Sequence, residues 1–245
     1  MSGRPPITVV TVVYNAEATI ARCVESVLAQ RIDGLEYLVI DGASTDATRP
    51  IVEGFGSGAI RLVSEPDKGL YDAMNKGLGL ATGRFIHFLN ADDRYIDDDA
   101  LASLLPHLDP SALCYGQMNY VGEDGFERIL GRPFSWFEEL RVSRIPQPTM
   151  FVAPELYRQV GLFDTSLKVA ADYDMVLRLA KRFPVKYIPQ PVTTMFSGGL
   201  SYRRPDLAFD EARRVSVRHG LGRFTSRAIY LARMMRWRLS GLGRG

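Results

Sequence analysis

The chain has 245 residues, of which 46% are apolar and 24% are charged, as expected of a folded globular protein with its own core. This composition excludes a disordered chain, a collagen and a small disulfide-bonded scaffold, and no apolar run is long enough to predict a membrane-spanning helix. The net charge of +2 is unevenly distributed, because residues 203–245 contain 11 arginines and 3 acids. The N-terminus shows no signal-peptide pattern, and the two widely separated cysteines, Cys23 and Cys114, are expected to be reduced thiols of a cytoplasmic protein.

Strand-like and helix-like patterns alternate in the first half of the chain. Runs of apolar, mostly β-branched residues predict strands, and apolar residues at three- and four-residue spacing predict helices. The predicted strands lie at residues 7–13, 36–40, 60–64 and 85–89, and the predicted helices at 16–30, 47–53 and 70–80. This alternation with short connections indicates an α/β domain with a mostly parallel central sheet.

The second half of the chain is less regular. Its predicted elements are a helix at 100–108, a strand at 113–121 ending in a turn at 122–125, an extended segment at 146–152, helices at 155–161 and 172–183, and a last strand at 185–188. No internal repeat or low-complexity linker divides the chain. We therefore expect one Rossmann-like domain over residues 1–205, followed by a helical, basic C-terminal extension over 206–245.

Polar side chains follow three of the four early strands. Tyr14 and Asn15 come after the first strand, Asp41 ends the second, and Asp92 and Asp93 follow the fourth. Because parallel strands end at the same edge of a sheet, these side chains should meet in one crevice, where open α/β sheets bind ligands. Each loop alone is equally consistent with a turn or a helix cap, but three together favour a divalent metal held by oxygen ligands.

Two nucleotide-binding motifs are excluded. The chain has no Gly-x-x-x-x-Gly-Lys-Ser/Thr loop. Gly77, Gly79 and Gly83 are spaced differently from a dinucleotide fingerprint, and they follow a helix instead of a strand. We interpret these glycines as the end of the helix at 70–80.

Asp172 opens the predicted helix at 172–183. A carboxylate at the start of a helix is often a cap. A carboxylate in this place can also reach the crevice and act as a general base. The local sequence leaves both alternatives open.

Several ordered motifs together resemble the inverting family 2 glycosyltransferases of the GT-A fold. The resemblance covers about residues 7–205, and its long central block is similar to the bacterial polysaccharide and glycolipid branch. The motifs lie at residues 11–15, 40–46, 65–77, 81–93, 161–164, 171–178 and 198–201.

The resemblance implies a metal-dependent transfer of a sugar from a nucleotide-sugar donor, with a UDP-sugar favoured, to a hydroxyl of a polysaccharide or lipid-linked glycan. It assigns Asp172 as the general base and Asp92 and Asp93 as ligands of Mg²⁺ or Mn²⁺. The implied nucleotide or donor contacts are Thr11, Val13, Tyr14, Asn15, Asp41, Lys68, Asn75 and Asp92. The resemblance supports Lys68 and Asn75 less strongly than the others.

The chain departs from the family pattern at two places. Asn90 stands where the metal motif often has Asp, which favours Asp92 as the primary ligand. Ala171 stands where Glu often precedes the base. Two other functions are weighed: a non-catalytic nucleotide- or glycan-binding module, which the presence of all three acids disfavours, and a nucleotidyltransferase, whose Gly-rich basic loop is absent after the first strand.

The basic C-terminal segment predicts an amphipathic helix over residues 223–239. Its apolar face repeats at helical spacing and consists of Phe224, Ala228, Leu231, Met235 and Leu239. Such a helix either lies on an anionic membrane surface, which would make the protein peripheral at the inner face of the cytoplasmic membrane, or packs this face on the domain. Nucleic-acid binding ranks last, because the body is acidic and no recognition motif is present. The sequence gives no indication of the oligomeric state.

Overall fold

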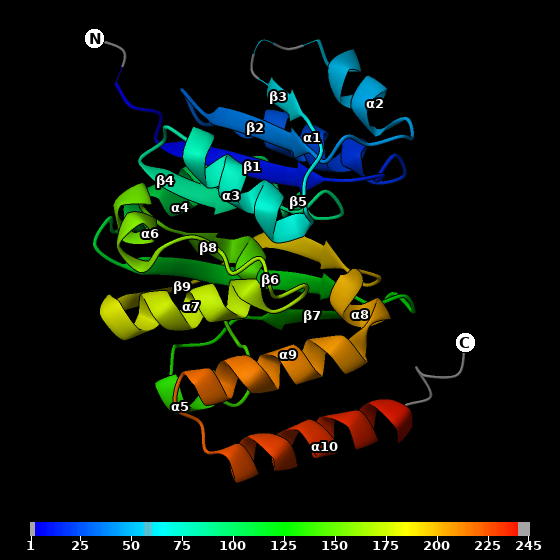
Figure 1. The fold of residues 1–245 in the computed structure, drawn as a ribbon. Coiled ribbons are helices and arrows are strands. Elements are labelled where there is room, and N and C mark those ends of the chain that lie inside the picture. The colour runs from blue at the N-terminus through cyan, green and yellow to red at the C-terminus, as the bar shows by residue number, and fades with distance from the viewer. Residues whose placement is uncertain (1–2, 57, 59, 240–245) are drawn as a thin grey trace.

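The computed structural model describes residues 3–56, 58 and 60–239, and it builds the first half of the chain around a four-stranded parallel sheet (Figure 1). Every strand of this sheet runs parallel to its neighbours, as the alternating pattern predicts. The strand order is β3-β2-β1-β4. The strands are β1 (Ile7–Val13), β2 (Glu36–Asp41), β3 (Ile60–Ser64) and β4 (Phe85–Phe88).

Helices cover both faces of this sheet, which explains why its central strands are almost entirely apolar. Helix α1 (Ile20–Leu28) packs in one core with Val9, and helix α3 (Leu70–Leu80) packs in a second core with Val10. Helix α2 (Thr48–Gly54) follows β2. All seven residues of β1 are buried, so adjacent side chains of this strand serve opposite cores.

Helix α3 ends at Leu80 as predicted, but its C-cap is Ala81 and not a glycine. Gly77 lies inside the helix, where a β-carbon would collide with the side chain of Val10. Gly83 similarly lies against the backbone of Thr8. Both glycines therefore allow close approach to β1, a packing role that local sequence does not distinguish from helix termination.

A second, mixed sheet continues from the first. An isolated bridge between Ile86 and Val152 joins the two. Strand β9 runs parallel to β6, and the other pairs in this sheet are antiparallel, in the order β5-β9-β6-β7 with β8 also paired to β6. The strands are β5 (Arg94–Tyr95), β6 (Leu113–Val121), β7 (Glu127–Leu130), β8 (Met150–Phe151) and β9 (Val185–Phe196).

Three long helices, α7, α9 and α10, are stacked beside the second sheet (Figure 1). None of the helices in the described ranges is long and apolar enough to cross a membrane. The remaining helices are α4 (Ala100–Leu104), α5 (Trp136–Glu139), α6 (Pro154–Val160), α7 (Ala171–Arg182), α8 (Leu200–Arg203), α9 (Pro205–Arg218) and α10 (Arg223–Leu239), with 3-10 turns at Leu105–His107 and Gln147–Thr149.

A buried charge cluster fastens α7 to α9. The carboxylate of Asp174 on α7 lies 2.8 Å from Arg178 Nε, 2.9 Å from His219 Nε2 and 3.3 Å from an Arg218 nitrogen. Arg178 belongs to the same helix, whereas Arg218 and His219 lie at the end of α9. These charge-assisted contacts connect the C-terminal segment to the helix that begins beside Asp172.

Candidate active site

The loops after β1 and β2 are bonded to each other at the carboxyl edge of the first sheet. The backbone N–H of Asn15 donates to Ser44 Oγ at 2.9 Å, and the N–H of Thr45 donates to Asn15 Oδ1 at 2.8 Å. Asn15 has a φ of 49°, in the left-handed region that Asn tolerates better than most residues. Beside it, the side chain of Tyr14 is 61% exposed and open to a ligand.

The carboxylate at the end of β2, that of Asp41, is hydrogen-bonded to neighbouring residues of the protein. Asp41 is fully buried, and its two carboxylate oxygens accept hydrogen bonds from the N–H and hydroxyl of Ser44 and from the hydroxyl of Ser64. These bonds give Asp41 the role of fixing the loop, and its direct contact with a nucleotide stays a prediction. Thr11 and Val13 are also buried, and their contact with a nucleotide stays a prediction.

A second carboxylate, that of Asp67, lies over this loop. A β-carbon at Gly42 would collide with Oδ2 of Asp67, so the glycine makes room for that acid. The other oxygen, Oδ1, accepts the N–H of Gly69 at 2.8 Å. Asp67 therefore lies, half-buried, beside the end of β2, where Asp41 is closed off.

The structure separates the two acids that follow β4. Asp93 is 1% exposed; its Oδ2 accepts a hydrogen bond from Asn90 at 3.0 Å, and its Oδ1 has no hydrogen-bond partner among the described residues. Burial, and secondarily the charge of Asp92, raise the pKa of Asp93 well above its ordinary value. Asp92 is only half-buried, and a β-carbon at Gly199 would come into van der Waals contact with its Oδ2. Asp92 is therefore the accessible carboxylate.

The surroundings of Asp92 fit a phosphate-bound ion better than a cage made by the protein. Within the described part of the chain, no three His, Cys, Asp or Glu side chains gather as a metal site. Mg²⁺ is commonly held by one or two carboxylates together with substrate phosphates and waters. One accessible carboxylate at the end of β4 matches that mode.

Asp172 lies in the first turn of α7 and does not cap it. The N-cap is Ala170, and no side-chain capping bond is present. Asp172 Oδ1 accepts the hydroxyl of Tyr71 at 3.1 Å and the N–H of Tyr173 at 2.8 Å, and no donor among the described residues bonds Oδ2. Burial raises the pKa of Asp172, and these two hydrogen bonds oppose that rise. The carboxylate thus has one fixed oxygen and one oxygen available to a ligand.

Tyr71 is the residue that orients this carboxylate. It begins α3, far from Asp172 in the sequence, and its ring stacks on that of Phe163 with centroids 5.9 Å apart. Burial and the charge of Asp172 raise the pKa of Tyr71 well above its ordinary value, so its hydroxyl stays protonated and donates. Sequence reasoning did not connect Tyr71 with the candidate base.

Replacing Tyr71 with Phe is expected to lower kcat about tenfold, the effect of losing one hydrogen bond to a charged group. Because that bond lowers the pKa of Asp172, its loss should also move the acidic limb of the pH profile of kcat/KM to higher pH. The measurement is the pH profile of both enzymes, with Tyr230→Phe, on helix α10 and outside the candidate site, as the control. An unchanged profile would contradict a role for Tyr71 in orienting the base.

Lys68 and Asn75, the two remaining predicted contacts, differ in their surroundings. Lys68 is exposed at a small, shallow pocket that Tyr71 and Lys168 also line. The Asn75 amide instead bonds the backbone N–H and carbonyl of Phe163, at 2.8 and 3.0 Å. Asn75 therefore holds the loop that packs on Tyr71, and its contact with a donor stays a prediction.

Known proteins resemble this chain over nearly its whole length. An uncharacterised glycosyltransferase of Mycobacterium tuberculosis is 31% identical, with 94% of this chain and 90% of the relative covered. A PGL/p-HBAD biosynthesis glycosyltransferase of Mycobacterium bovis is 28% identical, with 96% and 98% covered.

Solved structures share the fold. Staphylococcus aureus TarS 1–349, in complex with UDP-GlcNAc, has a TM-score of 0.65 at 20% identity and covers 94% of this chain and 72% of its own. The mannosyltransferase PcManGT of Pyrobaculum calidifontis, in complex with GDP-Man and Mn²⁺, has a TM-score of 0.65 at 22% identity and covers 97% and 76%. The expected GT-A architecture is thereby confirmed. The model of glycosyl transferase family 2 matches residues 8–162, and the chain belongs to that family.

Proposed function

We propose that the protein is an inverting, metal-dependent glycosyltransferase that uses Asp172 as its general base. The observation that carries this proposal is the carboxylate of Asp172, bonded at one oxygen by Tyr71 and open at the other, where Tyr71 also lines a shallow pocket at the start of α3. The donor is a nucleotide sugar, with a UDP-sugar favoured. The acceptor is a hydroxyl of a polysaccharide or of a lipid-linked glycan.

The reaction that fits this arrangement is a single displacement. The acceptor oxygen attacks the anomeric carbon as the bond from that carbon to the nucleoside diphosphate breaks, so the configuration inverts. Asp172 Oδ2 accepts the hydroxyl proton late, when the new bond has acidified it. Asp92 would hold Mg²⁺ or Mn²⁺ against the diphosphate, where the ion neutralises the charge of the leaving group.

The similar proteins support this choice of substrates. TarS has been solved with UDP-GlcNAc, and PcManGT has been solved with GDP-Man and Mn²⁺. Both complexes support a nucleotide-sugar donor, and the second supports a divalent ion. The name of the Mycobacterium bovis relative supports an acceptor in glycolipid synthesis. The three acids of the site are all present, which disfavours the non-catalytic binding module as the alternative.

Calorimetric titration tests the donor site. We expect one of UDP, GDP and dTDP to bind the wild-type protein in the presence of Mn²⁺, and Asp92→Ala to weaken that binding at least about tenfold. Asp99→Ala is the matched control, because Asp99 is an exposed acid that pairs with Arg31. If the folded wild-type protein binds none of the three nucleotides, the donor site is wrong and the binding-module alternative returns.

We infer that Asp67 accepts a hydrogen bond from the nucleobase. Asp67 Oδ2 lies over Gly42 at the end of β2, whereas both oxygens of Asp41 are bonded within the protein. A carboxylate there matches the ring N–H of a uracil or guanine.

Replacing Asp67 with Ala is therefore expected to raise the Kd for the nucleotide about tenfold, the effect of losing one hydrogen bond to a charged group. The control is Glu65→Ala, which removes a nearby exposed acid that pairs with Lys76. Both Kd values are measured by the same titration. Equal losses in the two variants would contradict a specific contact by Asp67.

A further inference from the structure

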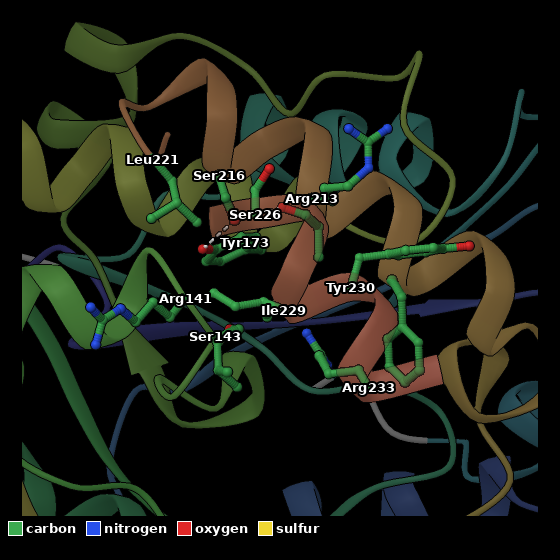
Figure 2. A pocket seen from close by; sticks show the side chains of 13 residues that line it. Arg141, Ser143, Tyr173, Arg213, Ser216, Leu221, Ser226, Ile229, Tyr230 and Arg233 are labelled. Carbon is green, nitrogen blue, oxygen red and sulfur yellow. Dashed lines mark hydrogen bonds between the residues drawn. The ribbon is translucent and has the colours of Figure 1, made fainter. Parts of the chain in front are cut away.

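Helix α10 packs on the protein through one face only. Ser226 is buried, and Ile229, Tyr230 and Arg233 are half-buried on the same side of the helix. Figure 2 shows Ser226 and Ile229 reaching into the pocket beside Tyr173, with Arg233 along the same wall. The guanidinium of Arg233 lies over the ring of Phe209 on α9, 4.3 Å from its centroid.

The opposite face of α10, which we name the outer face, is apolar and exposed. The exposed fractions are 94% for Phe224, 54% for Leu231, 64% for Met235 and 80% for Leu239, and Ala228 is exposed between them. These are the residues whose spacing predicted the apolar face. The alternative that they pack on the domain is wrong, because the helix packs through its other side.

Arginines accompany this exposed apolar face. Helix α10 contains five arginines and no acid. Four of them, Arg223, Arg227, Arg236 and Arg238, are exposed, and no ion pair involves them in the described part of the chain. On a helical projection, Arg227 and Arg238 fall next to Phe224 and Leu231, at the border of the outer face.

We propose that the outer face of α10 docks on an anionic phospholipid surface. A helix with apolar side chains on one side and unpaired arginines at its border buries the former at the level of the acyl chains and leaves the latter among phosphates. A second copy of this chain would instead place the arginines of two equivalent helices close together, so charge disfavours that occupant.

The docking surface is connected to the candidate base. Helix α10 packs along α9, and Glu211 on α9 bonds the backbone that leads to Asp172. Docking through α10 would therefore hold the catalytic crevice at a set place relative to the membrane. Docking rests on the proposed function only for its purpose, which is access to a lipid-linked acceptor. Membrane binding by α10 and sugar transfer at Asp172 can therefore be tested independently.

Cosedimentation with vesicles tests the proposal. We expect the wild-type chain to bind phosphatidylcholine vesicles containing about 30% phosphatidylglycerol much better than pure phosphatidylcholine, and to lose binding as salt rises. Leu231→Glu/Met235→Glu should lower the partition coefficient at least about tenfold. Arg227→Gln/Arg238→Gln should lower it about fivefold for each charge removed.

The control is Leu162→Glu, an apolar-to-acid change at a side chain that is 62% exposed, comparable to Met235, in the loop after α6. Circular dichroism verifies that each variant is folded. Asp172→Asn should bind vesicles as the wild type does, which separates docking from catalysis. Equal partitioning of the wild type and Leu231→Glu/Met235→Glu would overturn the proposal. So would a dimer, detected by light scattering, that this double variant dissociates.

Discussion

Replacing Asp172 with Asn is expected to lower kcat by about 10²- to 10⁴-fold, the usual contribution of a positioned general base. The amide keeps the shape of the carboxylate and can still accept the hydroxyl hydrogen bond of Tyr71. It cannot accept the proton of the acceptor hydroxyl. Because Asp172 lies on α7 and the accessible acid Asp92 follows β4, nucleotide binding should remain within about twofold of the wild type.

The measurement is transfer of radiolabelled sugar from the nucleotide donor found by calorimetry to a lipid extract, together with the Kd of the nucleotide. Asp206→Asn, which alters an exposed acid paired with Arg204, is the control and should retain full activity. Loss of transfer with intact nucleotide binding would support Asp172 as the base. Transfer by Asp172→Asn within tenfold of the wild-type rate would instead exclude that role and would also remove the basis for the role of Tyr71.

The elements with a strong local pattern are those that sequence predicts well. The strands at Ile7–Val13 and Leu113–Val121 and the helices at Leu70–Leu80 and Arg223–Leu239 have the predicted bounds. Strand β5 has two residues and β7 is exposed, so neither shows a period. Strand β9 continues through Pro189 and Pro191, which normally argue against a strand, and register shifts beside them accommodate the break.

The sequence predicts only that part of the candidate site which follows from the order of strands and helices along the chain. Parallel strands end at one edge, so the sequence places the loops of Asn15, Asp41 and Asp92 together. It cannot tell that Asp41 turns inward, because that depends on hydroxyls supplied by Ser44 and Ser64. Contacts that other helices and strands make to the base also leave no pattern in the local sequence.

The division of the chain at residue 205 stays a prediction.

The clearest such contact comes from Glu211, in the segment that the sequence assigns to a C-terminal extension. Glu211 is 2% exposed, and its carboxylate accepts the N–H groups of Lys168, Val169 and Ala170 at 2.8 to 3.1 Å. These three residues are the backbone that leads directly to Asp172. A carboxylate on α9 thus fixes the position of the candidate base on α7.

Replacing Glu211 with Ala is expected to lower the free energy of unfolding by about 3–5 kcal/mol, because three amides lose a charged acceptor in a closed site. Chemical denaturation measures this change. Asp210→Ala is the matched control: Asp210 is the preceding residue of α9 and pairs with Arg213 and Arg214 at a more exposed place. Its loss should cost less than about 1 kcal/mol. Similar losses for both variants would contradict a special role for Glu211.

Glu211→Gln separates positioning from stability, because it keeps one acceptor oxygen and removes the charge. The charge of Glu211 raises the pKa of Asp172, so its removal should lower that pKa and move the acidic limb of kcat/KM to lower pH. Tyr71→Phe should move the same limb to higher pH. Opposite shifts from two residues on different helices are expected only if both act through the ionisation of Asp172. A general loss of stability would lower activity without moving the limb in either direction, and that result would leave Glu211 a structural residue alone.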